Sequence, residues 1–229
     1  MAANFDARLV DLIGDYAAKI NDNHEIDLLN AAITEVADSV PPELLLKYAV
    51  APITLNNGTP TWTDVEGNKV LLVTRKDAGN VHRTCELVGI PAFSQAQDTD
   101  SIYNATSHTP VSCLTTAGGT TVLDVKPITT VSETASIYYF TYPTTNQKER
   151  TDTQLNDAGI PTQLFHAIAL RTATMYLQAY LSDAIQDDED QEIVAMLQVQ
   201  IKSLFTQYGL EMTRFTQGAS TQGESNDAA

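Results

Sequence analysis

The sequence IPTQLFHAIALRTATMYLQAYLSDAIQ, residues 160–186, begins the stretch that decides the fold. Pro161 suits the first turn of a helix, where the N–H that it lacks would have no intrahelical partner. Apolar side chains then recur at helical spacing, but they are spread around most of the helix surface. The pattern therefore predicts a helix that is buried on more than one side.

A second helix follows, and together the two helices occupy residues 160–215. The acidic run DDED at residues 187–190 breaks the first helix and places carboxylates in the first turn of the next, where the helix dipole favours them. Gly209 is predicted to end this second helix. We expect an antiparallel helix pair followed by a polar, flexible tail at residues 216–229. The apolar stripe of the second helix comprises Ile193, Met196, Leu197, Ile201, Leu204, Phe205 and Tyr208.

The N-terminal residues 1–50 are also predicted to be helical. Residues 5–20 carry an apolar stripe and form an acidic amphipathic helix rather than a signal peptide. A second helix is expected at about residues 24–37, with Ile26, Leu29, Ile33 and Val36 facing inward. Pro41 and Pro42 then interrupt the chain, and one more helical turn is expected at residues 43–48.

The pattern changes at Ala51, where Thr, Val, Gly, Asn and Pro become frequent and helical periodicity ends. Five or six short strands are expected in residues 51–143, which predicts a small antiparallel β-sandwich or barrel. Residues 91–110 contain few apolar side chains and are expected to form a long loop, and residues 144–159 a polar linker. The expected strands are at residues 53–55, 70–73, 81–90, 111–114, 121–125 and 136–142, with a hairpin turn at Gly118-Gly119.

Helices followed by strands and then by helices, without alternation, predict an α+β fold. Its helical bundle combines the N-terminal helices with the C-terminal helix pair, which packs on them, and the small antiparallel β-sandwich or barrel is inserted between. The predicted domains are 1–50, 51–143, 144–159, 160–215 and 216–229.

The charge of the chain limits its partners. Lys and Arg number 13 and Asp and Glu 29, which gives a net charge of −16. Such a chain repels nucleic acid and anionic membranes over most of its surface. No run of about 18 apolar residues is present, so no membrane span is expected. Cys85 and Cys113 lie in no metal-binding or redox spacing, and we expect both to be reduced thiols.

Residues that could carry out chemistry form no recognisable group. No Gly-x-Ser-x-Gly, P-loop or GxGxxG pattern occurs. The acidic run at 187–190 lacks the alternating carboxylates, central Gly and terminal Glu of an EF-hand loop. We therefore expect no catalytic residues, no metal site and no cofactor, and a protein that is not an enzyme. The four histidines are scattered, at His24, His82, His108 and His166.

Two local clusters could bind partners. Arg75, Lys76, His82 and Arg83 form a basic group, which is weak evidence for nucleic-acid binding on so acidic a chain and could equally face an acidic neighbouring subunit. Tyr and Phe are frequent at residues 138–142 and could stack on sugars or bases. Half of the side chains of an alternating strand must face the core, however, so a sandwich strand is the simpler interpretation.

The order of these segments resembles that of the head-to-tail adaptor proteins of tailed bacteriophages. The resemblance covers roughly residues 25–215 and depends on segment order and short phrases, after which the chain enters the helix pair at Ile160-Pro161. The phrases are Cys85-Glu86-Leu87-Val88, Ser101-Ile102-Tyr103-Asn104-Ala105-Thr106, Thr109-Pro110-Val111, Val122-Leu123-Asp124-Val125-Lys126-Pro127 and Ile137-Tyr138-Tyr139-Phe140-Thr141-Tyr142-Pro143.

The resemblance implies a structural virion protein. In that family a helical bundle carries a β-rich insertion, and the subunits form a homo-oligomeric, twelvefold ring beneath the portal protein. The ring connects capsid to tail or nozzle proteins and surrounds passing double-stranded DNA without sequence-specific binding. The implied location is the virion neck, after synthesis in the cytoplasm of the bacterial host.

The expected partner-binding residues are in two places. Terminal segments of similar adaptors order against the portal, which implies docking through Met212, Arg214 and Phe215, with Phe215 as the anchor. Arg75 and Lys76 are the candidates for contact with a neighbouring subunit. Two alternatives remain: another phage structural protein, such as a tail-tube, stopper or ring protein, and a β-sandwich module that binds a glycan through residues 138–142.

Overall fold

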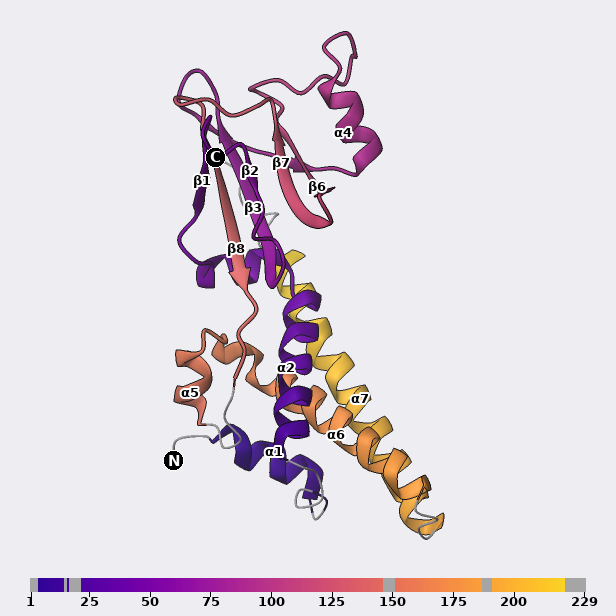
Figure 1. Ribbon diagram of the computed structural model, residues 1–229. Helices are drawn as coiled ribbons and strands as arrows, with labels where there is room; N and C mark the ends of the chain where they lie inside the picture. The colour runs from indigo at the N-terminus through magenta and orange to yellow at the C-terminus, as the bar shows by residue number, and fades with distance from the viewer. Residues whose placement is uncertain (1–3, 15, 17–21, 146–150, 187–190, 221–229) are drawn as a thin grey trace. The chain divides into compact units, whose positions relative to one another are not determined.

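The computed structural model of the protein describes residues 4–14, 16, 22–145, 151–186 and 191–220 (Figure 1). The chain divides into two compact units. The helical unit consists of residues 1–44 and 142–229, and the β unit of residues 45–141. Helices at both ends of the chain and two sheets in its middle confirm the predicted α+β fold.

Helix α6 (Phe165–Gln186) is the centre of the helical unit and packs against three other helices: α1, α2 and α7. The 3₁₀ turn η3 (Thr162–Leu164) leads into it, with Pro161 as the N-cap. The predicted burial on more than one side is confirmed. Its buried side chains are Phe165, Ala167, Ile168, Ala169, Leu170, Thr172, Ala173, Thr174, Tyr176, Leu177, Tyr180 and Ala184.

Helix α1 (Phe5–Ile13) is shorter than the helix that the sequence predicts at residues 5–20. The Asn4 side chain caps its start by accepting a hydrogen bond from the Asp6 amide. Gly14 ends it with φ +66°, a backbone conformation that residues with a Cβ rarely adopt. Residues 15 and 17–20 lie outside the described part of the chain. Phe5 packs edge-on against Phe165, with 6.4 Å between ring centroids.

Helix α2 (Asp22–Ser39) confirms the second predicted helix and the inward positions of Leu29, Ile33 and Val36, all of which are buried. Ile26, also expected to face inward, is half-buried. The turn expected after the two prolines is also present. It consists of α3 (Pro42–Leu45) followed by the 3₁₀ turn η2 (Leu46–Tyr48).

Helix α7 (Gln191–Ser220) differs from the prediction at its C-terminal end. Gly209 does not stop the helix, because its neighbours continue the hydrogen-bonding pattern and an interior glycine costs only about 1 kcal/mol relative to alanine. Residues 216–220, expected in the flexible tail, are helical as well. The acidic run at 187–190 and residues 221–229 lie outside the described residues.

Residues 144–159 were expected to be a linker, but they contain helix α5 (Asp152–Asp157). Thr151 and Gln154 form a reciprocal capping box at its start. Leu155 is buried, and Asp152 forms a 2.8 Å ion pair with Arg8 of α1. A cap and one buried leucine thus attach this segment to the helical unit. Residues 146–150 lie outside the described part.

The β unit contains two four-stranded sheets with the strand orders β1-β8-β3-β4 and β2-β7-β6-β5. All neighbours are antiparallel except β5 and β6. The strands are β1 (Ile53–Leu55), β2 (Thr61–Trp62), β3 (Asn68–Lys76), β4 (His82–Thr84), β5 (Glu86–Leu87), β6 (Val111–Ala117), β7 (Thr120–Lys126) and β8 (Ala135–Thr141).

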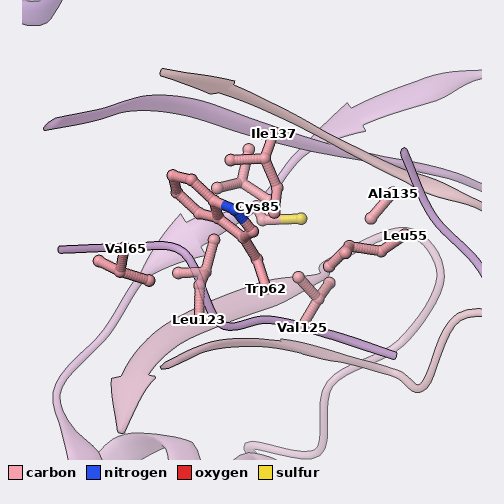
Figure 2. Packing of buried hydrophobic residues seen from close by; sticks show 9 residues of the cluster. Leu55, Trp62, Val65, Cys85, Leu123, Val125, Ala135 and Ile137 are labelled. Atoms are coloured by element: carbon pink, nitrogen blue, oxygen red, sulfur yellow. The ribbon is translucent and has the colours of Figure 1, made fainter. Parts of the chain in front are cut away.

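Both sheets contribute side chains to one apolar core (Figure 2). Trp62 lies beside Cys85 in this core, and its indole ring packs on Tyr139 with 5.0 Å between centroids. The predicted hairpin is confirmed: β6 and β7 meet at Gly118 and Gly119, both with positive φ. The core residues are Leu55, Trp62, Val65, Val73, Cys85, Leu123, Val125, Ala135 and Ile137.

The single strand predicted at residues 81–90 is wrong. The chain changes sheets at Cys85, so that β4 pairs with β3 and β5 pairs with β6. The expected long loop that follows is also wrong at its start, because α4 (Ile90–Gln97) forms there. Phe93 and Ala96 are buried, and α4 packs against β6.

Candidate interaction surface

The residues expected to bind partners lie in different units. Met212, Arg214 and Phe215 belong to α7 of the helical unit, whereas Arg75 and Lys76 belong to β3 of the β unit.

The C-terminal part of α7 carries Met212 and Phe215 one turn apart on the same side of the helix, and both are half-buried. Arg214 is exposed and pairs with Glu211 at 2.7 Å, three residues earlier. Such an exposed pair is worth only about 0.3 kcal/mol. The aromatic ring of Phe215 thus has part of its surface available, and the Arg214 charge is partly neutralised within the helix.

Arg75 does not face a partner, which corrects the prediction. Its side chain is only 1% exposed and forms a 2.8 Å ion pair with Glu133. Its guanidinium also donates to the carbonyls of Lys76, Pro127 and Ile128. A buried charge needs such a set of acceptors. Arg75 therefore holds the connection between β7 and β8 inside the β unit.

Of the other residues in the basic group, His82 and Arg83 are exposed. Arg83 pairs with the buried Asp77 at 3.1 Å, and Lys76 is half-buried. The Val81 amide, ahead of Arg83 and the Gly79 amide, lowers the pKa of Asp77 below its ordinary value, although burial opposes this. Asp77 thus remains a carboxylate that closes the turn between β3 and β4.

The aromatic residues of the β8 region are mostly engaged in packing. Phe140 is buried, and Tyr139 packs on Trp62. The Tyr142 hydroxyl donates to Asp38, and burial, together with that carboxylate, raises the pKa of Tyr142. An open row of stacking rings, which a glycan-binding strand would need, is not formed by these side chains.

An apolar groove between α6 and α7 is a surface that the sequence analysis did not identify. Its volume is about 360 Å³, and its walls include Leu181, Ile201 and Phe205. Phe205 belongs to the apolar stripe predicted for the second helix, but its side chain is 55% exposed. Met196, in the same predicted stripe, is 60% exposed. The buried positions of the stripe are Leu197, Leu204 and Tyr208.

The opposite flank of α7 is also apolar. Met196, Val199 and Leu210 recur at helical spacing and are each more than half exposed. The signal was present in the sequence as apolar residues on two sides of the helix. Periodicity alone does not tell which side faces the chain's own core.

The loop from residue 98 to residue 110 forms a second hollow, in the β unit. Its lining is polar and includes Glu86, Asn104 and His108, with a volume of about 430 Å³. At the tip, Ile102 is 91% exposed and Tyr103 is 66% exposed. Ile102 is the most exposed of the large apolar side chains in the described residues.

The titratable groups offer little chemistry. Both cysteines are free and buried, and burial raises the pKa of Cys85 to about 12 despite the opposing charge of Arg75. Burial also raises the pKa of Cys113. Among the described residues, no three His, Cys, Asp or Glu side chains lie close enough together to hold a metal ion. No described helix has the length and apolar character needed to cross a membrane.

No protein-family model matches this sequence. A search of curated proteins finds no match either.

Proposed function

We propose that this protein is a structural subunit of a bacteriophage virion, in which copies form a head-to-tail adaptor ring beneath the portal. The ring would connect the capsid to the tail or nozzle proteins and surround the channel through which DNA leaves. The observation that carries the proposal is a β unit, residues 45–141, inserted between the two parts of a helical unit whose longest helix has exposed apolar residues.

The exposed surface of α7 supports assembly with other proteins. Apolar residues are exposed on both of its flanks, at the groove beside Phe205 and at the stripe of Met196, Val199 and Leu210. Clustered apolar side chains on a protein surface mark sites of association more often than isolated ones do. A subunit that contacts a neighbour on each side needs two such surfaces.

The charge of the protein supports a position beside DNA without adhesion to it. The net charge is −16, and duplex DNA carries one negative charge per about 1.7 Å. The described arginines, moreover, are each paired with a carboxylate of the same chain: Arg8, Arg75, Arg83, Arg171 and Arg214. The charges of these arginines are therefore offset within the chain.

The copy number in purified particles tests the proposal. Quantitative mass spectrometry of virions, with the portal protein as internal standard, should find this chain in a fixed ratio to the portal that corresponds to one twelvefold ring. A much higher ratio would favour a tail-tube protein, and absence from the particle would exclude a structural role.

A further inference from the structure

We propose that copies of this chain bind head to tail, with the loop DTDSIYN (residues 98–104) of one copy seated in the α6–α7 groove of the next. We call these two parts the acidic loop and the groove. The inference specifies the contact between ring subunits and so rests on the proposed function. It comes from the exposure of the loop, the lining of the groove and the charges on each.

The acidic loop is held in shape by its own hydrogen bonds. The Asp98 side chain accepts from the Asp100 amide at 3.0 Å, and the Ser101 hydroxyl accepts from the Tyr103 amide at 3.1 Å. Asn104 donates from its side chain to the Asp98 carbonyl at 2.8 Å. Because the loop is already ordered, it would lose little conformational freedom on binding.

The tip of the acidic loop presents apolar surface to solvent. Ile102 is 91% exposed and Tyr103 is 66% exposed. Burial of apolar surface is favourable by about 25 cal/mol per Å², and a Tyr anchor is common at the centre of interfaces. An ordered loop that exposes both side chains is suited to insertion in an apolar recess.

The groove has a matching character. It is lined by Gln178, Leu181, Gln198, Ile201, Lys202 and Phe205. Its volume of about 360 Å³ lies within the range of recesses that bind small groups. Among the described residues no carboxylate lines it. These lining side chains therefore present no like charge to an acidic segment.

Lys202 provides the complementary charge. In the described part of the helical unit, the arginines are ion-paired: Arg8 with Asp152, Arg171 with Glu35, and Arg214 with Glu211. Lys202 has no such partner among the described residues. In the acidic loop, the carboxylates of Asp98 and Asp100 form no ion pair with any described residue. Loop and groove thus carry opposite unpaired charges beside apolar surface.

The arrangement favours a heterologous contact over a symmetric one. Two grooves placed face to face would bring two Lys202 ammonium groups to the same interface, whereas loop against groove pairs Lys202 with carboxylates. When two copies are joined by one such heterologous contact, one copy still has a free acidic loop and the other still has a free groove. It therefore continues from copy to copy and gives a ring when the rotation closes.

Disulfide trapping of the full-length chain tests the contact. The variant with both Ile102→Cys and Gln198→Cys is oxidised mildly at physiological ionic strength and run on a non-reducing gel. We expect a ladder of trimers and larger covalent species. Each single variant should give dimers at most, and a mixture of the two should give a heterodimer. The native Cys85 and Cys113 are buried and do not contribute.

The matched control replaces the loop cysteine with Val131→Cys, at a residue of the same unit that is 82% exposed, and retains Gln198→Cys. A ladder as strong as that of the test pair, or no ladder from the test pair, would overturn the contact. A charge swap gives a second measurement. Asp100→Lys or Lys202→Asp alone should lower trapping severalfold, and the two together should restore it.

The outcomes separate this inference from the proposed function. If particles contain the ring but the cysteine pair does not trap, the contact is wrong and the virion role remains. If the ladder forms but the chain is absent from particles, the contact stands and the virion role is wrong.

Discussion

Leu197 and Met196 are neighbours on α7 with opposite environments. Leu197 is fully buried against the rest of the helical unit, whereas Met196 is 60% exposed. We expect Leu197→Ala to lower the free energy of unfolding by about 2–5 kcal/mol, because a buried cavity replaces packed atoms. Leu197→Asp should prevent stable folding, since it buries a charge without a partner. Met196→Ala, as the control, should change stability by about 0.5 kcal/mol or less.

Urea unfolding followed by circular dichroism measures these changes. Equal effects of Leu197→Ala and Met196→Ala would contradict the assignment of the two helix faces.

Asp77 gives the stability a pH dependence in acid. Folding lowers the pKa of this carboxyl below its ordinary 3.8, first through the Val81 amide. The unfolded state therefore binds protons at a higher pH than the folded state. The stabilisation that Asp77 contributes is fully present above its unfolded pKa and is lost as pH falls through its folded pKa.

The measurement compares wild type with Asp77→Asn by urea unfolding between about pH 6 and pH 3. Wild type should lose more stability than the variant as the pH falls. As the control, Asp64→Asn replaces an exposed carboxylate and should leave the dependence of stability on pH as it is in wild type. Parallel profiles for wild type and Asp77→Asn would show that Asp77 is not responsible.

Arg75 marks the limit of prediction from sequence at the residue scale. The inward positions of Leu29, Ile33 and Val36 follow from apolar spacing alone, and the structure confirms them. Arg75 was expected at the surface because it is charged. Its burial depends on Glu133 and on the carbonyls of residues 127 and 128, more than 50 positions away. No local pattern contains that information.

At the scale of elements, α7 is longer than predicted and more exposed. Gly209 was taken as a stop signal, but α7 continues beyond it, and Met212 and Phe215 there are half-buried. Tertiary contacts thus outweigh the weak propensity of one glycine. The same applies to α4, which forms where few apolar residues occur, because Phe93 and Ala96 are enough to attach it to β6.

The strand predicted at residues 81–90 failed for a related reason. Its alternation is genuine, but Cys85 turns into the core and the chain passes from one sheet to the other there. The hairpin at Gly118-Gly119 was predicted correctly because two adjacent glycines are a local turn signal, and both adopt positive φ angles. Elements with local signals were predictable, and the assignment of strands to sheets was not.

The C-terminal part of α7 is the element expected to dock on the portal. Phe215 is half-buried, so part of its ring can enter a partner's pocket. We expect Phe215→Ala to weaken binding to purified portal rings by about tenfold, which corresponds to about 1.4 kcal/mol. Arg214→Ala, which removes only an exposed intrahelical pair, should change binding less than twofold.

Surface plasmon resonance with immobilised portal rings gives these affinities, and circular dichroism verifies the fold of each variant. If Phe215→Ala binds as wild type does, Phe215 serves only the packing of the helix end.

At the scale of the whole molecule, net charge governs assembly. Copies that each carry −16 repel one another over about 30 Å at 10 mM salt. We expect the isolated protein to be a monomer or small oligomer under these conditions and to form rings when portal rings are added. Sedimentation velocity at about 10 mM salt measures both states. Stable large rings of the protein alone at low salt would contradict this expectation.

The location of the protein in the virion is the deciding observation. Cryo-electron microscopy of purified particles should show a ring of copies against the portal, with density for the α6–α7 pair and a separate β unit in every copy, around the DNA channel. A neck in which other proteins occupy all the density, or density for this chain at another place in the particle, would contradict the proposed adaptor role.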